Sequence, residues 1–187
     1  NTGNKELRIN VENLFKDFVV RGEDIIVLNP GESEIIPLYI IARIDTVPDL
    51  YLGKLIISSG NTQKEILLAI EVESRGILLD VRAEIVNSYE NVFAGGEILA
   101  EIRLFNFGGS DGKKDVLIEY IIKDFENKEI FKETESLAIE TQVTFVKKIS
   151  IPEDIHDGNY ILYIRAIYNG EVASASDNFN IISSKKP

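Results

Sequence analysis

Carboxylates are the chemically versatile side chains that this sequence supplies in quantity. The chain has 31 Asp and Glu residues, one His, at position 156, and no Cys. With a single His, the chain cannot form a metal site that needs several histidines. This His lies in an acidic turn with Glu153, Asp154 and Asp157, where a Ser-His-Asp triad is hard to build. Two acids at a set separation would suffice for glycoside hydrolysis. Among so many carboxylates some pairs reach that separation by chance, so we assign no catalytic residue and predict a non-enzymatic protein.

Acidic loops are the second place where chemistry could arise, because hard oxygen ligands on loops suit Ca²⁺. Asp111 and Asp115 flank a Gly-containing loop, and the 153–157 turn carries three carboxylates. Neither spacing matches an EF-hand, and acidic loops are usually just solvated. The chain also lacks a Gly-rich phosphate loop, a His-Glu-x-x-His motif and a Gly-x-Ser-x-Gly elbow. We therefore predict no metal site and no cofactor.

The composition favours a β-rich fold and excludes several partner classes. Hydrophobic residues make up 44% of the 187 residues, and most are Ile, Val, Leu, Phe and Tyr, which suit strands. The net charge of −11 would repel a phosphate backbone, so we predict no nucleic-acid binding. No apolar run approaches the ~20 residues of a membrane helix, which predicts no membrane contact within this segment. There is no Met, even at position 1, so we expect a processed product or a piece of a longer protein.

Period-two alternation, short apolar runs and the turn signals between them predict strands along the whole chain. In the first half we expect strands at residues 7–12, 25–28, 35–44, 51–58 and 65–73. In the second half we expect them at residues 77–86, 98–105, 116–122, 128–134, 144–151, 160–168 and 173–181. Pro37 cannot donate to a ladder, so the 35–44 strand is predicted to be an edge strand or to begin after the proline. No segment of the first half predicts a helix.

A short polar step at residues 73–76 separates two apolar runs and marks the predicted domain boundary. We therefore expect one domain at residues 1–75 and a second at 76–187, with a polar tail from about 183. The brief linker leaves little slack between the two domains.

Two local motifs occur once in each half. Asn1-Thr2-Gly3 corresponds to Asn106-Phe107-Gly108, and Tyr51, after Asp49, corresponds to Tyr160, after the 157–159 turn. About thirty residues of strand-like sequence precede the second Asn-x-Gly, and none precede the first. The first domain is therefore predicted to begin within a hairpin and to lack its opening strands.

We interpret Tyr51 and Tyr160 as corner residues, with the ring in the core and the hydroxyl bonded to upstream backbone. A ligand contact by either is the alternative. Aromatic side chains on one outer face would form a sugar-binding platform, although we expect most of them to be buried; the candidates are Phe15, Phe18, Phe105, Phe107 and Phe125.

These turn and corner motifs resemble those of known surface modules. Residues 30–33 and 48–55 resemble NEW3-type Ig-like modules, and residues 94–97, 106–108 and 158–160 are similar to CARDB-like adhesion-related modules. The resemblance implies an all-β chain of two tandem Ig-like antiparallel β-sandwich domains. It also implies an archaeal or bacterial stalk, adhesin or accessory module at the cell surface or outside the cell, and it carries no catalytic residues.

The incomplete first domain leaves three explanations open. The missing strand lies upstream in the full chain, or the module pairs differently, or another subunit supplies it by strand addition. We expect a structural or adhesive module, archaeal in origin, that acts as a stalk or as a self-assembling filament subunit, with protein as its partner. The alternative is a carbohydrate-binding accessory module of a secreted enzyme, with a surface glycan as partner.

Overall fold

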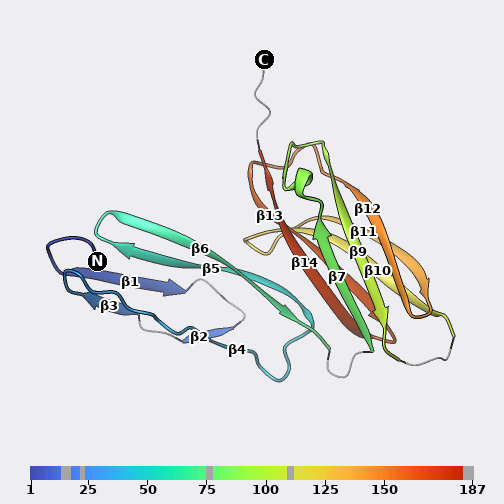
Figure 1. The fold of residues 1–187 in the computed structure, drawn as a ribbon, viewed down its shortest axis with the longest axis horizontal. Helices are drawn as coiled ribbons and strands as arrows, with labels where there is room; N and C mark the ends of the chain where they lie inside the picture. Colours follow the sequence, from blue (N-terminus) through green and yellow to red (C-terminus); the bar gives the residue numbers. More distant parts are fainter. Residues whose placement is uncertain (14–17, 22–23, 75–77, 109–111, 183–187) are drawn as a thin grey trace, which may run out of the picture. The chain divides into compact units, whose positions relative to one another are not determined.

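The alternating segments of the sequence form β-strands. We analysed a computed structural model that describes the chain except for residues 14–17, 22–23, 75–77, 109–111 and 183–187, and its strands can be followed in Figure 1. Among the described residues there is no α-helix, and a single 3-10 turn occurs at Asn87–Tyr89. The predicted all-β fold class is confirmed. None of the described segments is a helix with the length and hydropathy of a membrane span.

The described contacts group the chain into two compact units. The first comprises Asn1–Val47 and Tyr51–Ile70, and the second comprises Pro48–Leu50 and the chain from Glu71 onward. The predicted boundary at 75/76 falls outside the described residues, as does the predicted polar tail, and both stay predictions.

The first unit is built around a four-stranded sheet and a two-stranded sheet. The four strands lie in the order β3 (Ile25–Leu28), β1 (Leu7–Asn13), β5 (Asp49–Ser59) and β6 (Thr62–Val72). A separate antiparallel pair joins β2 (Val19–Arg21) to β4 (Tyr39–Ile41).

The second unit has two sheets. One has the order β11 (Glu129–Ile139), β10 (Lys114–Asp124), β13 (Gly158–Tyr168), β14 (Glu171–Ile181) and β8 (Asn91–Val92). The other has the order β12 (Gln142–Ser150), β9 (Glu97–Asn106) and β7 (Leu79–Ile85). Every pair is antiparallel except the short β14–β8 contact, which is parallel.

Alternation along these strands builds one core between the two sheets. On β9 the residues at even positions from Ile98 to Leu104 are buried, and the residues between them face outward. They pack in the same cluster as Ile118, Tyr120 and Ile122 of β10 and as Leu162 and Ile164 of β13. Side chains from both sheets therefore fill one layer, which is the arrangement of a β-sandwich.

The two units differ sharply in how much apolar surface they bury. Among the described residues, the buried apolar side chains of the first unit number four, namely Phe18, Ile26, Leu52 and Leu55, whereas the second unit has twenty-eight. Since burial of apolar surface is the main favourable term in folding, the second unit carries most of this stabilisation.

The two repeated motifs adopt the same local structure in both units. Asn1 and Asn106 each accept a hydrogen bond at Oδ1 from the backbone N–H of the Gly two residues later, at 3.0 Å in both cases. The Tyr51 hydroxyl donates to the carbonyl of Val47 at 2.7 Å, and the Tyr160 hydroxyl donates to the carbonyl of His156 at 2.9 Å. Each tyrosine therefore bonds four residues upstream, as predicted. The ring of Tyr160 is buried in the core, whereas Tyr51 is half-buried against Phe18.

Turn chemistry also follows the prediction at the Asn169-Gly170 dipeptide. Its φ angles of 52° and 83° are both in the left-handed region, as a two-residue type I′ hairpin requires. The turn joins β13 to β14 in the register Tyr168↔Glu171.

The predicted strand at residues 35–44 is longer than the strand in the structure. Of this segment the structure pairs Tyr39–Ile41 with β2 and leaves residues 32–38 without strand pairing. Pro37 lacks an N–H, so pairing begins after it, which was the second of the two possibilities. The expected break after residue 134 is also wrong, since β11 continues to Ile139. β2, β8 and the 3-10 turn were not predicted, because three or fewer residues carry no readable period.

Candidate functional site

An exposed apolar surface lies along β4 and its flanks in the first unit. Residues 32–45 are all exposed except Ile36. We define the apolar edge by its six large apolar members, which are Ile35, Leu38, Tyr39, Ile40, Ile41 and Ile44. Ile35 and Ile44 are 95% and 90% exposed. Exposed apolar clusters of this kind mark interaction sites in soluble proteins.

The strand β4 is bare on both of its faces. Successive side chains of a strand point to opposite faces, so Tyr39 and Ile41 lie on one face and Ile40 on the other. All three are exposed, at 62%, 47% and 43%. A strand of a complete sandwich buries one face, and β4 buries neither among the described residues. Its pairing with β2 uses one side of its backbone, and among the described residues no strand pairs with the other side, which is therefore a sheet edge there.

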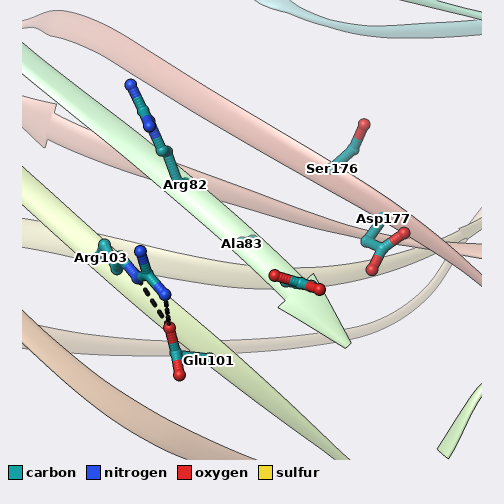
Figure 2. A pocket seen from close by; sticks show the side chains of 7 residues that line it. Arg82, Ala83, Glu101, Arg103, Ser176 and Asp177 are labelled. Carbon is teal, nitrogen blue, oxygen red and sulfur yellow. Dashed lines mark hydrogen bonds and ion pairs between the residues drawn. The ribbon is translucent and has the colours of Figure 1, made fainter. Parts of the chain in front are cut away.

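A second candidate is an open groove on the second unit, between the outer face of β7 and β9 and the neighbouring β14 (Figure 2). Its volume is about 400 Å³. We call it the β7–β9 groove and define it by its lining residues Arg82, Ala83, Glu84, Glu101, Arg103, Ser176 and Asp177. Strand register places like charges opposite each other, because Arg82 pairs with Arg103 and Glu84 pairs with Glu101.

Carboxylates already compensate the two arginines of the groove. The Arg103 guanidinium donates to Glu101 through Nε at 2.7 Å and also through Nη2, as the dashed lines in Figure 2 show. Arg82 Nε lies 3.6 Å from Asp80 Oδ2. Glu84 adds a further carboxylate to the lining, so the groove has donors and acceptors but no positive excess for an anion.

The acidic side chain from β14 has a structural partner. Asp177 Oδ2 accepts a hydrogen bond from the backbone N–H of Ile85 at 2.7 Å. This bond ties β14 to the end of β7, and it forms one wall of the groove.

An aromatic pair adjoins this groove. The rings of Phe105 and Phe107 are nearly parallel, at 4°, with centroids 6.2 Å apart. Arg82, which lines the groove, lies over the Phe105 ring at 5.5 Å. Phe107 is 66% exposed. Groove and aromatic pair therefore form one continuous surface through Arg82.

The other phenylalanines of the predicted platform do not join this pair. Phe18 is buried and packs edge-to-face on Tyr51, with ring centroids 5.0 Å apart. Phe125 is half-buried in the turn after β10, and Phe15 lies outside the described residues. Two of the five candidates are thus brought together on an outer face.

The acidic loops do not converge on a metal-binding geometry. Glu153, Asp154 and Asp157 are exposed in the connection between β12 and β13, and Asp115 is exposed at the start of β10. Asp111 lies outside the described residues. Within the part of the chain that the structure describes, no three His, Cys, Asp or Glu side chains are grouped to hold an ion.

A charged cluster joins the two sheets of the second unit. Lys147 of β12 reaches Glu133 at 2.7 Å and Glu135 at 3.4 Å on β11, and it lies 4.6 Å from the Tyr120 ring centre. Burial lowers the pKa of Lys147, but the two carboxylates outweigh burial and raise that pKa overall. Burial raises the pKa of Tyr120, and the hydrogen bond that its hydroxyl donates to Glu135 raises it further. Both groups stay protonated, so the cluster is suited to holding β12 on β11.

Other buried charges are also paired. Glu119 accepts from Arg165 Nη1 at 3.0 Å and from Lys132 Nζ at 2.7 Å. Lys123, which is 6% exposed, donates to Asp49 Oδ1 at 3.0 Å. Buried charges with such partners are explained by folding and need no ligand.

Sequence reasoning missed the β7–β9 groove, and a signal for it was present. The outward positions of the predicted strands at 77–86 and 98–105 carry alternating charges, Asp80, Arg82 and Glu84 on one and Glu101 and Arg103 on the other. Two charged outer faces form one site when their strands are adjacent in a sheet. The sequence of either segment alone does not show that the two strands are adjacent.

No protein-family model matches the chain, and no curated protein matches it. Among solved structures it is similar to the CARDB domain of a Pyrococcus furiosus protein in complex with di-metal ions, at 14% identity and a TM-score of 0.39, over 56% of this chain and 87% of that one. It is also similar to a family 123 glycoside hydrolase from Clostridium perfringens, at 12% identity and a TM-score of 0.42, over 59% of this chain and 28% of that one. A third is the sporulation control protein Spo0M from Bacillus subtilis, at 15% identity and a TM-score of 0.37, over 59% of this chain and 51% of that one.

These likenesses are of fold class. The chain spans about a quarter of the hydrolase and about half of Spo0M. The CARDB similarity concerns part of the chain; the NEW3 resemblance of the first half stays a prediction. Since every TM-score is below 0.5, we take the β-sandwich from the strand order and core of the chain itself.

Proposed function

We propose that this chain is a non-enzymatic structural or adhesive module of a prokaryotic cell-surface or extracellular protein, and that it assembles through the apolar edge. Its partner is a second copy, which contributes a strand. The resemblance of its turn motifs to surface modules supports the location and an archaeal source, and repeated addition of copies would give a filament or sheath.

The observation that carries the proposal is the exposure of the apolar edge. Ile35, Tyr39, Ile40 and Ile41 are exposed beside a backbone whose second side has no strand partner in the part of the chain that the structure describes. The second unit buries most of its apolar strand residues in one core, whereas the members of the apolar edge all lie in the first unit. An added strand would pair with the free backbone groups and cover one row of these side chains.

Self-assembly is tested by the mass of residues 1–187 in solution. We expect the weight-average mass from light scattering to rise with protein concentration. Ile35→Lys should hold the protein at monomer mass, because a charge would have to be buried in the interface. Ile35 is 95% exposed, so the substitution leaves the fold of the free chain unchanged.

The matched control is Ile182→Lys, at a 41% exposed isoleucine of the second unit. It should associate as the unchanged protein does. A wild-type chain that stays monomeric at every concentration would refute self-assembly, and equal effects of the two lysines would refute the assignment to the apolar edge.

Ionic strength gives a second test. Two copies with a net charge of −11 each repel one another, and salt screens exposed charges over about 10 Å at 0.1 M. Association should therefore strengthen as NaCl rises. Weakening by salt would indicate that ion pairs, and not the apolar edge, drive assembly.

A further inference from the structure

We infer that the β7–β9 groove and the adjoining aromatic pair bind a neutral oligosaccharide. This site lies on the second unit and is independent of assembly through the apolar edge, so either proposal can fail without the other.

The aromatic pair provides a surface for the apolar face of a sugar ring. Phe107 is 66% exposed, and its ring plane is nearly parallel to that of Phe105. Leu78, 48% exposed, joins this end of the surface, because its carbonyl accepts the Phe107 N–H at 2.7 Å. An exposed Phe gains little for folding, whereas it offers a ligand a rigid apolar area at low entropic cost.

The groove provides hydrogen-bonding groups of both kinds along the same face. Glu84 and Glu101 accept, and Arg82 and Arg103 donate. Sugar hydroxyls donate and accept at neighbouring positions, so they can bond to a carboxylate and a guanidinium that already lie side by side. Apolar area with a few convergent polar groups in a space of a few hundred Å³ is typical of ligand sites.

Charge decides which ligand class fits. The carboxylates of Asp80, Glu84 and Glu101 would repel a uronate or sulfate, and each arginine already has an acidic neighbour. A cation would have to compete with Arg82 and Arg103 for Asp80 and Glu101, the carboxylates that already pair with them. A neutral polyol meets neither the repulsion that an anion meets nor the competition that a cation meets, so the geometry favours uncharged sugars.

The extent of the surface indicates an oligosaccharide. Glu101, Arg103, Phe105 and Phe107 follow one another on the same side of β9 and its extension. Six residues of extended chain span about 20 Å at ~3.3 Å per residue. This length accommodates several sugar rings in a row.

The test is a titration of ¹⁵N-labelled residues 1–187 with cellohexaose, mannohexaose and chitohexaose, and with hexagalacturonic acid as an anionic probe. We expect at least one neutral hexasaccharide to shift the amide signals of residues 82–84 and 101–107. Hexagalacturonic acid should shift them less at equal concentration. No shift in these amides by any neutral probe at millimolar concentration overturns the inference, and tighter binding of the anionic probe overturns the assignment to neutral sugars.

Variants separate binding from folding. Phe107→Ala should raise the Kd of the bound hexasaccharide about tenfold through loss of ring contact, and Phe107→Trp should preserve or strengthen binding. The matched control is Phe93→Ala, at a 50% exposed Phe away from the groove lining, which should leave the Kd unchanged. Wild-type affinity in Phe107→Ala, or equal loss in both alanine variants, overturns the site; the Trp variant keeps the test decisive if Phe107→Ala lowers stability.

Discussion

Replacing the corner tyrosine Tyr160 with Phe should destabilise the second unit by about 1 kcal/mol, the net contribution of one hydrogen bond. The ring is 7% exposed and lies 6.0 Å from Phe179, so Phe keeps the packing and loses the hydroxyl. The lost bond is the 2.9 Å contact with the carbonyl of His156. His156 is exposed and this hydrogen bond is only partly buried, so we expect water to reach the carbonyl in the variant and the larger cost of a buried unsatisfied group not to apply.

The equivalent change in the first unit, Tyr51→Phe, should cost less, about 0.5 kcal/mol or below, because its bond to Val47 is solvent-exposed and water competes for it. Urea unfolding followed by far-ultraviolet circular dichroism measures both variants. Tyr39→Phe, at a 62% exposed ring, is the control and should not change the midpoint. A Tyr160→Phe protein as stable as wild type, or a Tyr51→Phe cost as large as that of Tyr160→Phe, would refute the reasoning from burial.

Three further predictions concern the core, the pH dependence and the local stability. Ile102→Ala, at a fully buried position between the sheets, should lower the free energy of unfolding by about 2–5 kcal/mol in urea titrations; a loss below about 1 kcal/mol would contradict its place in the core. The raised pKa values of Tyr120 and Lys147 favour their protonated forms in the folded state, so this stability is present below about pH 10, the unfolded value, and is lost as the pH rises further. Unfolding measured between pH 9 and 12 should show this loss, and Tyr120→Phe should show a shallower slope; equal slopes would contradict the assignment. Amide hydrogen exchange should be slower in β9, β10 and β13 than in β1 and β3, because the first unit has the smaller core; the reverse order would contradict this comparison.

The strands and turns were largely predictable because their signals are local. The boundaries of β3 follow from its continuous apolar run, the positions of β1 and β9 follow from alternation, and those of β13 and β14 follow from the apolar residues on either side of the Asn169-Gly170 turn. The Asn169-Gly170 turn follows from the ease with which both residues adopt positive φ. The corner role of Tyr160 was also predictable, since its partner is four residues upstream.

For the predicted 35–44 strand, a start after Pro37 was one of the two predicted possibilities, but its end at Ile41 was not predicted, for a non-local reason. Ile35 to Ile44 has the composition of a strand, but a strand needs a neighbour for its backbone groups. Of the described chain, β2 supplies three paired residues at 39–41, and Pro37 prevents simple continuation. Together with the paired residues 39–41, the unpaired remainder carries the apolar edge on which the proposed assembly depends.

The sequence by itself determined that this chain is built of short strands, where most of them turn, and which side chains of each strand share a face. The tertiary structure alone decided that Arg82 and Glu84 of β7 lie beside Arg103 and Glu101 of β9, with Asp177 closing the groove. It also decided that one side of β4 has no strand partner among the residues that the structure describes. Successive side chains of a strand point to opposite faces because of local backbone geometry. The sequence of each strand therefore shows which of its residues share a face. Which strands become neighbours depends on how the whole chain buries its apolar surface, and no single segment records that.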